Sequence, residues 1–549
     1  MRLLLPLICL GAFAASAQES VTIRVDAGRS SGAFAPISNY FGYDEPNFTY
    51  TKNGRKLIGE LAALSRSPVY IRTHFILATG NGQPSLKFGS TNAYTEDASG
   101  KPVYDWTIID RILGTYLEAG ATPFVEIGFM PEALSSKPQP YQVEWVLGAR
   151  NAGYSAGWSY PPKDFNKWGD LIRKWMEHIA EKYGAEATST WYFEVWNEPD
   201  ISYWQGTPEE YDRLYDVTAA AVKKVLPHAR VGGPASTGPA GQRAGEFLRQ
   251  FLAHCEQAGT PLDFITFHAK GRPQVVDGHV RMGISKNTED VDAGFRIVAS
   301  FPKFRSLPIV ISESDPEGCA ACSARVYPQN AYRNGPLYAS YEALMMKNIR
   351  DLAQARGTNI AGMLTWAFEF ENQPYFDGLR TLATNGIDKP VLNVFRMAGM
   401  MDGDRLAVES SARLPLERIE AEGVRSSADI DALGARGRDH LSLLIWNYHD
   451  DDIPAPTANV DVELTGLPGG DRRVLVHRYA IDETNSNAWA AWKKMGSPQQ
   501  PTPEQYVQLQ AAGQLQEAVS PRWMNVRQGA LRLTLRLQRQ GVCLVRVEL

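Results

Sequence analysis

Two glutamates stand where apolar, strand-like runs of the sequence come to an end. Glu198 closes the run at 191–200 (WYFEVWNEPD), and Glu313 lies in the run at 308–316 (PIVISESDP). Two carboxyl groups at one cleft suit the cleavage of a glycosidic bond, because one protonates the leaving oxygen while the other meets positive charge at the anomeric carbon. A separation of ~5 Å permits direct attack and a covalent glycosyl intermediate, whereas ~6.5 to 9.5 Å leaves room for water and indicates inversion.

Other polar and aromatic residues stand at the ends of further runs. A lone glutamate at such a place is usually a solvated turn residue or an ion-pair partner, and a histidine is often a hydrogen-bonded core residue. A tryptophan in a strand either fills the core or offers its face to a sugar ring. With both interpretations open, the candidates for substrate contact are His74, Asn197, His268, Lys270, Trp366, Glu369 and Glu371, with Arg72 and Glu126 beside them.

The sequence has no clear motif for binding a cofactor, a metal ion or a nucleic acid. No closely spaced ligand pair such as His-x-x-x-His occurs among the candidates, so no metal site is predicted. We find no P-loop and no dinucleotide fingerprint, and the pair Gly232-Gly233 lacks the spacing of a phosphate-binding loop, so no cofactor is expected. A formal charge of −5 over 549 residues offers no basic surface for nucleic acid. The expected partner is an oligo- or polysaccharide, and the oligomeric state stays open.

The region 37–400 repeats one theme, in which a short apolar run ends in polar or Gly/Pro residues and an amphipathic stretch of helical period follows. Buried strands that alternate with helices predict a parallel sheet, and eight such units predict a closed (β/α)8 barrel. The carboxyl ends of the strands form the active face of that fold, where the candidate residues would meet. The eight runs are 39–45, 68–77, 122–130, 191–199, 229–236, 263–271, 308–316 and 360–370.

The pattern changes over 401–549, where several segments alternate apolar and polar residues with turn residues between them. This alternation is typical of strands with one exposed face and predicts an accessory β-sandwich. The strand-like segment within 18–36 is expected to pair into the same sandwich. The stretch at 481–515 reads as loop and helix that fold back to rim the active face.

The N-terminus reads as a secretory signal peptide over residues 1–17, with Arg2, an apolar run and Ala15-Ser16-Ala17 as the cleavage site. No later segment has the ~18 to 20 consecutive apolar residues that a membrane helix needs. We therefore expect a periplasmic or secreted protein without a membrane span. In an oxidising compartment, Cys319 and Cys322 could close a small disulfide loop.

Several motifs together resemble glycoside hydrolase family 39, whose members include β-D-xylosidases and α-L-iduronidases. They are VWNEPD at 195–200, RTH at 72–74, FHAKG at 267–271, FPKF at 301–304 and SESDPEG at 312–318, and the stretch at 481–505 extends the resemblance over nearly the whole mature chain. The resemblance implies a (β/α)8 barrel with an appended β-sandwich, retention of anomeric configuration and removal of terminal sugars.

The resemblance also implies roles for single residues. Glu198 matches the general acid/base and Glu313 the nucleophile, while Asn197 matches the residue that binds the sugar 2-hydroxyl. A β-D-xylopyranoside and an α-L-iduronide share their anomeric geometry and differ chiefly in a carboxylate on C5. Lys270 and Arg380 resemble the cations that hold this carboxylate in iduronidases, but each could instead pair with a nearby acid.

The choice of glycone therefore stays open between a uronide and a neutral pentopyranoside such as xylose, with arabinose and galactose as further alternatives. A rival from another class is a carbohydrate-binding protein on an inactive scaffold. Such a protein has little reason to keep Asn197, Glu198 and Glu313 together, so their joint presence favours an enzyme.

Overall fold

The computed structural model describes residues 20–150 and 155–549. The predicted signal peptide at 1–17 lies outside the described residues, so secretion stays a prediction. None of the described helices is long and apolar enough to cross a membrane.

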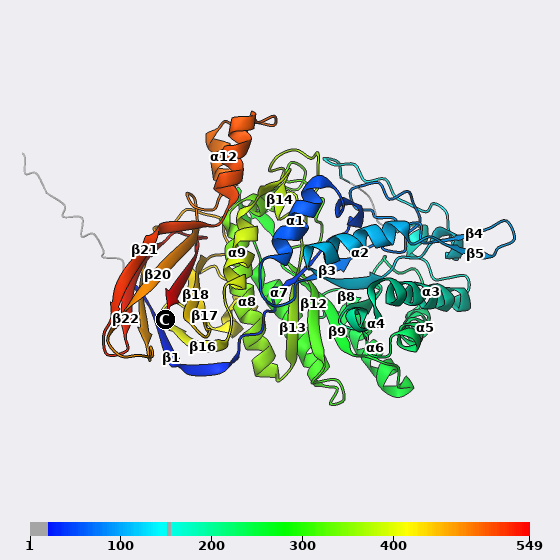
Figure 1. The fold of residues 1–549 in the computed structure, drawn as a ribbon, viewed down its shortest axis with the longest axis horizontal. Helices are drawn as coiled ribbons and strands as arrows, with labels where there is room; N and C mark the ends of the chain where they lie inside the picture. Colours follow the sequence, from blue (N-terminus) through cyan, green and yellow to red (C-terminus); the bar gives the residue numbers. More distant parts are fainter. Residues whose placement is uncertain (1–19, 151–154) are drawn as a thin grey trace, which may run out of the picture.

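The centre of the molecule is a closed barrel of eight parallel strands, which coincide with the eight predicted runs (Figure 1). The order around the barrel follows the chain, and β13 closes against β2. The strands are β2 (Tyr40–Gly42), β3 (Tyr70–Thr73), β6 (Thr122–Ile127), β7 (Tyr192–Val195), β8 (Arg230–Ser236), β9 (Phe264–Lys270), β12 (Pro308–Asp315) and β13 (Asn359–Trp366).

Amphipathic helices surround the barrel, and their ends carry the expected signals. At α5 (Pro208–Val225), Thr207 and Glu210 form a capping box and a proline occupies the first turn, which satisfies free backbone N–H groups. The other large helices are α1 (Lys52–Ala62), α2 (Thr107–Ala119), α3 (Phe165–Tyr183), α6 (Gln242–Ala258), α7 (Ile284–Ala299), α8 (Pro336–Arg356) and α9 (Pro390–Gly399).

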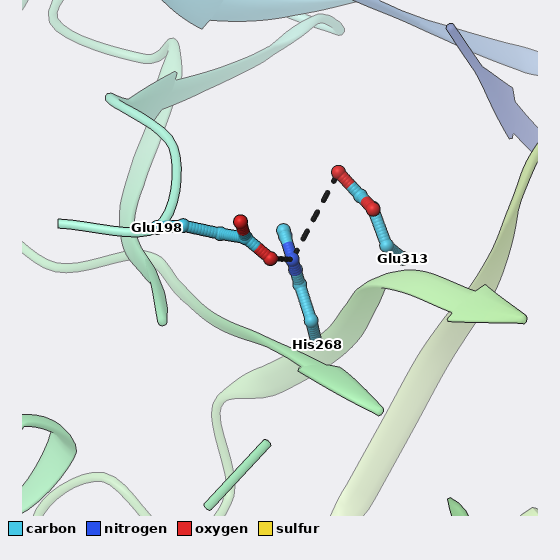
Figure 2. A group of neighbouring side chains, drawn as sticks. All are labelled: Glu198, His268 and Glu313. Atoms are coloured by element: carbon cyan, nitrogen blue, oxygen red, sulfur yellow. Dashed lines mark hydrogen bonds and ion pairs between the residues drawn. The ribbon is translucent and has the colours of Figure 1, made fainter. Parts of the chain in front are cut away.

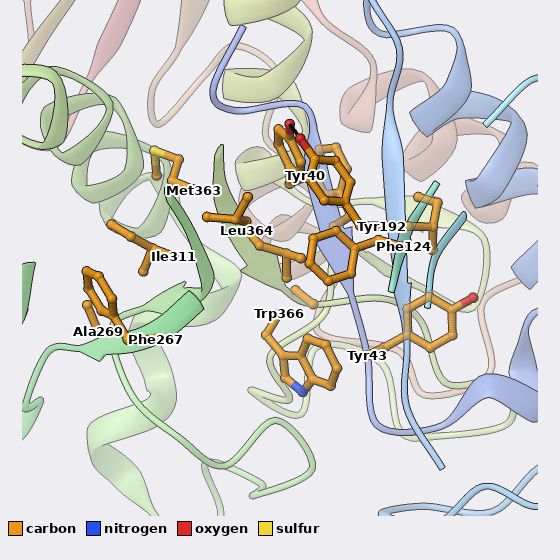
Figure 3. Close-up of a cluster of buried hydrophobic side chains, with 14 of the residues drawn as sticks. Tyr40, Tyr43, Phe124, Tyr192, Phe267, Ala269, Ile311, Met363, Leu364 and Trp366 are labelled. Atoms are coloured by element: carbon orange, nitrogen blue, oxygen red, sulfur yellow. Dashed lines mark hydrogen bonds between the residues drawn. The ribbon is translucent and has the colours of Figure 1, made fainter. Parts of the chain in front are cut away.

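Aromatic and aliphatic side chains fill the barrel interior (Figure 3). Tyr40 stacks on Tyr70 and meets Tyr192 edge-on, while Phe124 stacks on Tyr192. Burying several aromatic rings of this size removes a large apolar area from water and fixes the strands against one another. The barrel is thus a packed core, and its polar residues are left to its carboxyl end.

The accessory domain is one nine-stranded sheet with a hydrophobic core of its own. The first strand, β1 (Val21–Ala33), lies between β16 and β19, so both ends of the described chain meet in this domain. The remaining strands are β16 (Asp404–Ser410), β17 (Asp429–Arg436), β18 (His440–Tyr448), β19 (Ala458–Thr465), β20 (Arg472–Ile481), β21 (Gln516–Val526), β22 (Leu531–Leu537) and β23 (Val542–Glu548). The predicted class, a (β/α)8 barrel with an accessory β-sandwich, is confirmed, and the nine strands of the accessory domain form one continuous sheet.

Two short helices leave the sheet and rest on the loop that follows β13. Figure 1 shows α12 (Pro503–Gly513) standing out beside this loop, with α11 (Ala488–Lys494) packed against it. The backbone N–H of Tyr375 donates to Gln499 at 2.9 Å, and the Tyr506 hydroxyl donates to the Asn385 carbonyl at 2.9 Å. These contacts connect the accessory domain to a loop at the carboxyl end of the barrel.

The sequence leaves open whether Cys319 and Cys322 form a disulfide, and in the structure they do, in the loop after β12. The Arg333 guanidinium donates to the carbonyls of both cysteines, at 2.6 and 2.9 Å. The Arg333 contacts hold both ends of the short disulfide loop beside the end of β12.

Candidate active site

Glu198 and Glu313 face each other across the carboxyl end of the barrel (Figure 2). One carboxylate oxygen of each lies, together with a ring nitrogen of His268, in a group whose members are all within 4.8 Å of one another. His268 Nδ1 is 2.9 Å from Glu198 Oε1 and 3.8 Å from Glu313 Oε1. Glu198 from the turn after β7, His268 from β9 and Glu313 from β12 thus converge at one point.

The backbone around Glu198 takes an unusual path. Trp196 and Glu198 have φ angles of 71° and 45°, in the left-handed region that non-glycine residues seldom adopt. Each such residue costs on the order of 1–3 kcal/mol, and the surroundings must hold it in place. The Trp196 indole donates to the Tyr203 carbonyl at 3.0 Å, and the Glu198 N–H donates to the Ala235 carbonyl at 2.9 Å. The sequence WNEP therefore turns Glu198 out of the strand.

Glu313 lies among positive charges and is only 5% exposed. Lys270 Nζ is 2.7 Å from Glu313 Oε2, and Arg72 Nη1 is 3.4 Å from Oε1. Burial raises the pKa of Glu313, but Lys270, His268 and Arg72 outweigh it and hold the pKa well below its usual range. Glu313 is therefore an anion at neutral pH.

Arg72 connects Glu313 and Asn197 to two buried glutamates at the floor of the site. It donates to Glu194 at 2.6 Å and to Asn197 Oδ1 at 2.8 Å, and it lies 3.0 Å from Glu126. The guanidinium and both of these glutamates are fully buried. Since Asn197 accepts from Arg72 through Oδ1, its Nδ2 remains as a donor for another group.

We expect Arg72→Met to lower the free energy of unfolding by about 3–5 kcal/mol, the usual cost of removing one partner from a buried ion pair. The variant leaves Glu126 and Glu194 without their cation inside the barrel. Urea denaturation at pH 7 measures the change. The matched control is Arg173→Met on α3, whose two ion pairs are partly exposed and should contribute about 1 kcal/mol or less. An unchanged urea midpoint for Arg72→Met would contradict a structural role for this ion-pair network.

His74 and Trp366 line the floor of the site beside Arg72. His74 Nδ1 is hydrogen bonded to Glu126, whose pKa burial raises despite the nearby histidine and arginine. Trp366 is 1% exposed, donates through Nε1 to Asp44 at 3.0 Å and lies under the Arg72 guanidinium at 4.7 Å. Its indole is thus part of the barrel packing at the base of the site.

Arg380 reaches the site only through other residues. Its side chain is fully buried, donates to the Trp366 carbonyl at 2.8 Å and to Glu317 at 3.3 Å, and lies 3.8 Å from Asp315. The sequence leaves open whether this cation holds a substrate or pairs with a protein carboxylate, and the structure pairs it with two.

Glu369 and Glu371 are not brought together with Glu198 and Glu313. Glu369 accepts from the Gly386 N–H, and burial raises its pKa to about 7. Glu371 accepts from the backbone N–H of Asn53 at 2.5 Å. Both carboxyl groups stabilise the loop after β13 in this structure.

A second charged group beside the site is absent from the sequence-based candidates. Asp44 and Glu45 follow β2, and Lys87 from the loop after β3 pairs with Asp44 and donates its backbone N–H to Glu45. Burial and the charge of Asp44 raise the pKa of Glu45 to about 8, although Lys87 opposes the shift. The acidic residues at the end of the run 39–45 were a signal for Asp44 and Glu45. No motif around Lys87 indicates that it lies beside the site.

Glu198, His268 and Glu313 are close enough to act as ligands of a metal ion. However, Lys270 and Arg72 already bind the Glu313 carboxylate, and a divalent cation there would be repelled by both. The residues present fit a cation site poorly.

Known proteins resemble the chain over most of its length. Residues 70–528 match the family described as glycosyl hydrolases family 39. A beta-xylosidase of Geobacillus stearothermophilus is 28% identical over 85% of either chain, and one of Caldicellulosiruptor saccharolyticus is 30% identical over 74% of this chain and 76% of its own. An alpha-L-iduronidase of Homo sapiens is 28% identical over 63% of this chain and 55% of its own.

Among solved structures, a monomeric beta-xylosidase from Caulobacter crescentus CB15 superposes with a TM-score of 0.75 at 24% identity, over 96% of this chain and 99% of its own. At this level of identity, the similarity shows that the two proteins share a fold. A family match over most of the sequence, around two carboxylates that face each other at the mouth of a barrel, identifies the chain as a member of glycosyl hydrolase family 39 and a glycoside hydrolase.

Proposed function

We propose that the protein is a retaining, exo-acting glycosidase that releases terminal β-D-xylopyranosyl units. The observation that carries the proposal is the close approach of Glu198 and Glu313, with carboxylate oxygens within 4.8 Å. Inverting enzymes need ~6.5 to 9.5 Å between the two carboxyl groups to admit a water molecule, so this spacing supports double displacement.

In the first step, Glu313 attacks the anomeric carbon while Glu198 gives its proton to the glycosidic oxygen. The anionic state of Glu313, held by Lys270 and Arg72, supports the role of nucleophile. The leaving sugar departs as an alcohol, and a covalent glycosyl ester forms on Glu313 with inverted configuration.

In the second step, Glu198 is a carboxylate and takes a proton from water, which attacks the same carbon and releases Glu313. Two inversions give net retention. The Nδ2 of Asn197 has no hydrogen-bond partner among residues 20–150 and 155–549 and is suited to donate to the oxygen of the sugar 2-hydroxyl. A bond there that strengthens in the transition state lowers the barrier more than it stabilises bound substrate.

Exo action is supported by a contact across the barrel mouth. The Arg150 guanidinium lies 5.6 Å from the centroid of the Tyr327 ring. Arg150 belongs to the loop after β6 and Tyr327 to the loop after β12, the third and seventh barrel strands, which stand opposite each other. A contact that bridges the barrel mouth leaves room for the end of a polysaccharide but obstructs the passage of its middle.

The charged residues around Glu198 and Glu313 support a neutral glycone. Arg380 pairs with Asp315 and Glu317, and Lys270 binds Glu313 and Asp315, so both cations that a uronate would need already bind protein carboxylates.

The test is parallel hydrolysis of an aryl β-D-xyloside and an aryl α-L-iduronide. We expect kcat/KM to favour the xyloside by about 100-fold, on the scale of ~1–3 kcal/mol or more for a charged group left unsatisfied in a buried site. We expect Arg380→Ala to lower activity on whichever substrate is turned over and to lower Tm, because the guanidinium supports β12 from within the protein.

An α-L-iduronidase is the second candidate, favoured by the presence of Lys270 at the nucleophile. It would replace the first if the iduronide were the faster substrate and Arg380→Ala lost activity on the iduronide alone. Equal loss on both substrates would remove the idea of a carboxylate clamp.

A further inference from the structure

A cavity of about 730 Å³ opens on the accessory domain. It lies where the two edge strands of the sheet, β21 and β22, come close without hydrogen bonding to each other. Further walls come from β1, β19 and β20, and no barrel residue lines it. We call it the edge groove; it is separate from the site of Glu198 and Glu313.

An exposed indole forms part of the edge groove. Trp523 on β21 is 59% exposed and is the one aromatic among the large, well-exposed apolar side chains of residues 20–150 and 155–549. The Arg473 guanidinium lies 5.4 Å from the centroid of its ring. Leaving an indole in water is unfavourable for folding, whereas its flat face suits the apolar face of a sugar ring.

The charges of the edge groove are unbalanced in favour of arginine. Four arginines and two carboxylates line it. Glu463 is already shared between Arg24 and Arg532, at 3.2 Å from each. Within the described part of the chain, no carboxylate lies within ion-pair distance of Arg478 or Arg522, so these two keep a positive charge in the groove.

One nitrogen of Arg478 also lacks a hydrogen-bond acceptor in the part of the chain that the structure describes. The Nε atom of Arg478 is buried and has no partner among the described residues. The buried Nε is out of reach of a ligand in the groove, but the other N–H groups of an arginine without an acidic partner can form charge-assisted bonds to a carboxylate. The second carboxylate of the groove, Asp461, accepts from the hydroxyls of Ser20 and Thr534 instead.

We propose that the edge groove is a secondary binding site for a polysaccharide chain that carries uronate groups. A sugar ring stacks on Trp523, and a uronate carboxylate binds the arginines that have no acidic partner, Arg478 and Arg522. Holding the polymer at a second site raises the local concentration of its ends near the barrel without adding a contact at the catalytic pair. The site takes no part in bond cleavage.

Affinity electrophoresis of the full chain tests the site, with a glucuronate-bearing xylan and an unsubstituted xylan as probes. The variants are Trp523→Ala and Arg522→Met, with Val507→Ala as the matched control, because Val507 is exposed on α12 outside the groove. We expect Trp523→Ala to weaken binding of both probes about tenfold. Arg522→Met should weaken only the glucuronate-bearing probe, and the control should bind like wild type.

Two further measurements separate this site from the catalytic one. Hydrolysis of a small aryl glycoside and the Tm should be unchanged in all three variants. Wild-type affinity in both Trp523→Ala and Arg522→Met would overturn the proposal, and so would an equal loss in the Val507→Ala control. Sedimentation velocity provides the remaining test: a dimer of the wild type that Trp523→Ala abolishes would assign the groove to a second copy of this chain and overturn polysaccharide binding.

Discussion

Glu198→Ala will slow the hydrolysis of glycosides with poor leaving groups by about 10²- to 10⁴-fold in kcat/KM, the usual contribution of general acid catalysis. An aryl glycoside whose phenol leaves without a proton will still form the glycosyl ester on Glu313. That ester will then persist, because no base remains to activate water. Stopped-flow measurement of the phenol will show a burst followed by slow turnover.

Azide supplies the decisive measurement for this variant. It attacks without losing a proton and fits the space left by the Glu198 side chain, so it will restore turnover. The product will be a glycosyl azide with the configuration of the substrate, because azide attacks from the face that Glu198 occupied. Failure of azide to accelerate turnover would refute the assignment of Glu198 as acid/base.

Glu313→Ala will lose activity on every substrate, by about 10⁵-fold or more, on the scale of enzymes that lose their nucleophile. No covalent ester can form, so no burst is expected even with an activated phenol. Azide added to this variant takes the position of the missing carboxylate and gives a product of inverted configuration. The two variants are therefore distinguished by the stereochemistry of their azide products, which NMR reads directly.

The matched control is Glu209→Gln, a change to an exposed glutamate in the first turn of α5, which should keep wild-type rates. Substantial residual turnover of a good substrate by Glu313→Ala would exclude Glu313 as the nucleophile. Both variants should fold, because Glu198 is half-buried and the two cations that pair with Glu313 keep other carboxylate partners.

The barrel could be predicted from the sequence because its strands are short apolar runs separated by helices of clear period. The meeting of Glu198 and Glu313 followed from that fold, since residues at the carboxyl ends of barrel strands face a common mouth. The left-handed backbone at Trp196 and Glu198 could not be predicted, because neither tryptophan nor glutamate normally indicates that conformation.

The partners of the charged residues could not be predicted in the same way. Whether Arg380 faces a substrate or pairs with Asp315 depends on the path of the loop after β13, and loops carry no periodic signal. Lys87 reaches Asp44 for the same reason, through a loop without a motif. Strand ends are thus predictable positions, while the choice of ion-pair partner is a property of the assembled structure.

The place of β1 in the accessory sheet has a consequence for biosynthesis. This strand precedes all barrel strands in the chain, yet its neighbours β16 and β19 are made only after the whole barrel has been translated. A nascent chain must therefore carry β1 as an unpaired, aggregation-prone segment until β16 and β19 have been translated. Export in an unfolded state would postpone the pairing of both ends until the entire polypeptide is available at once.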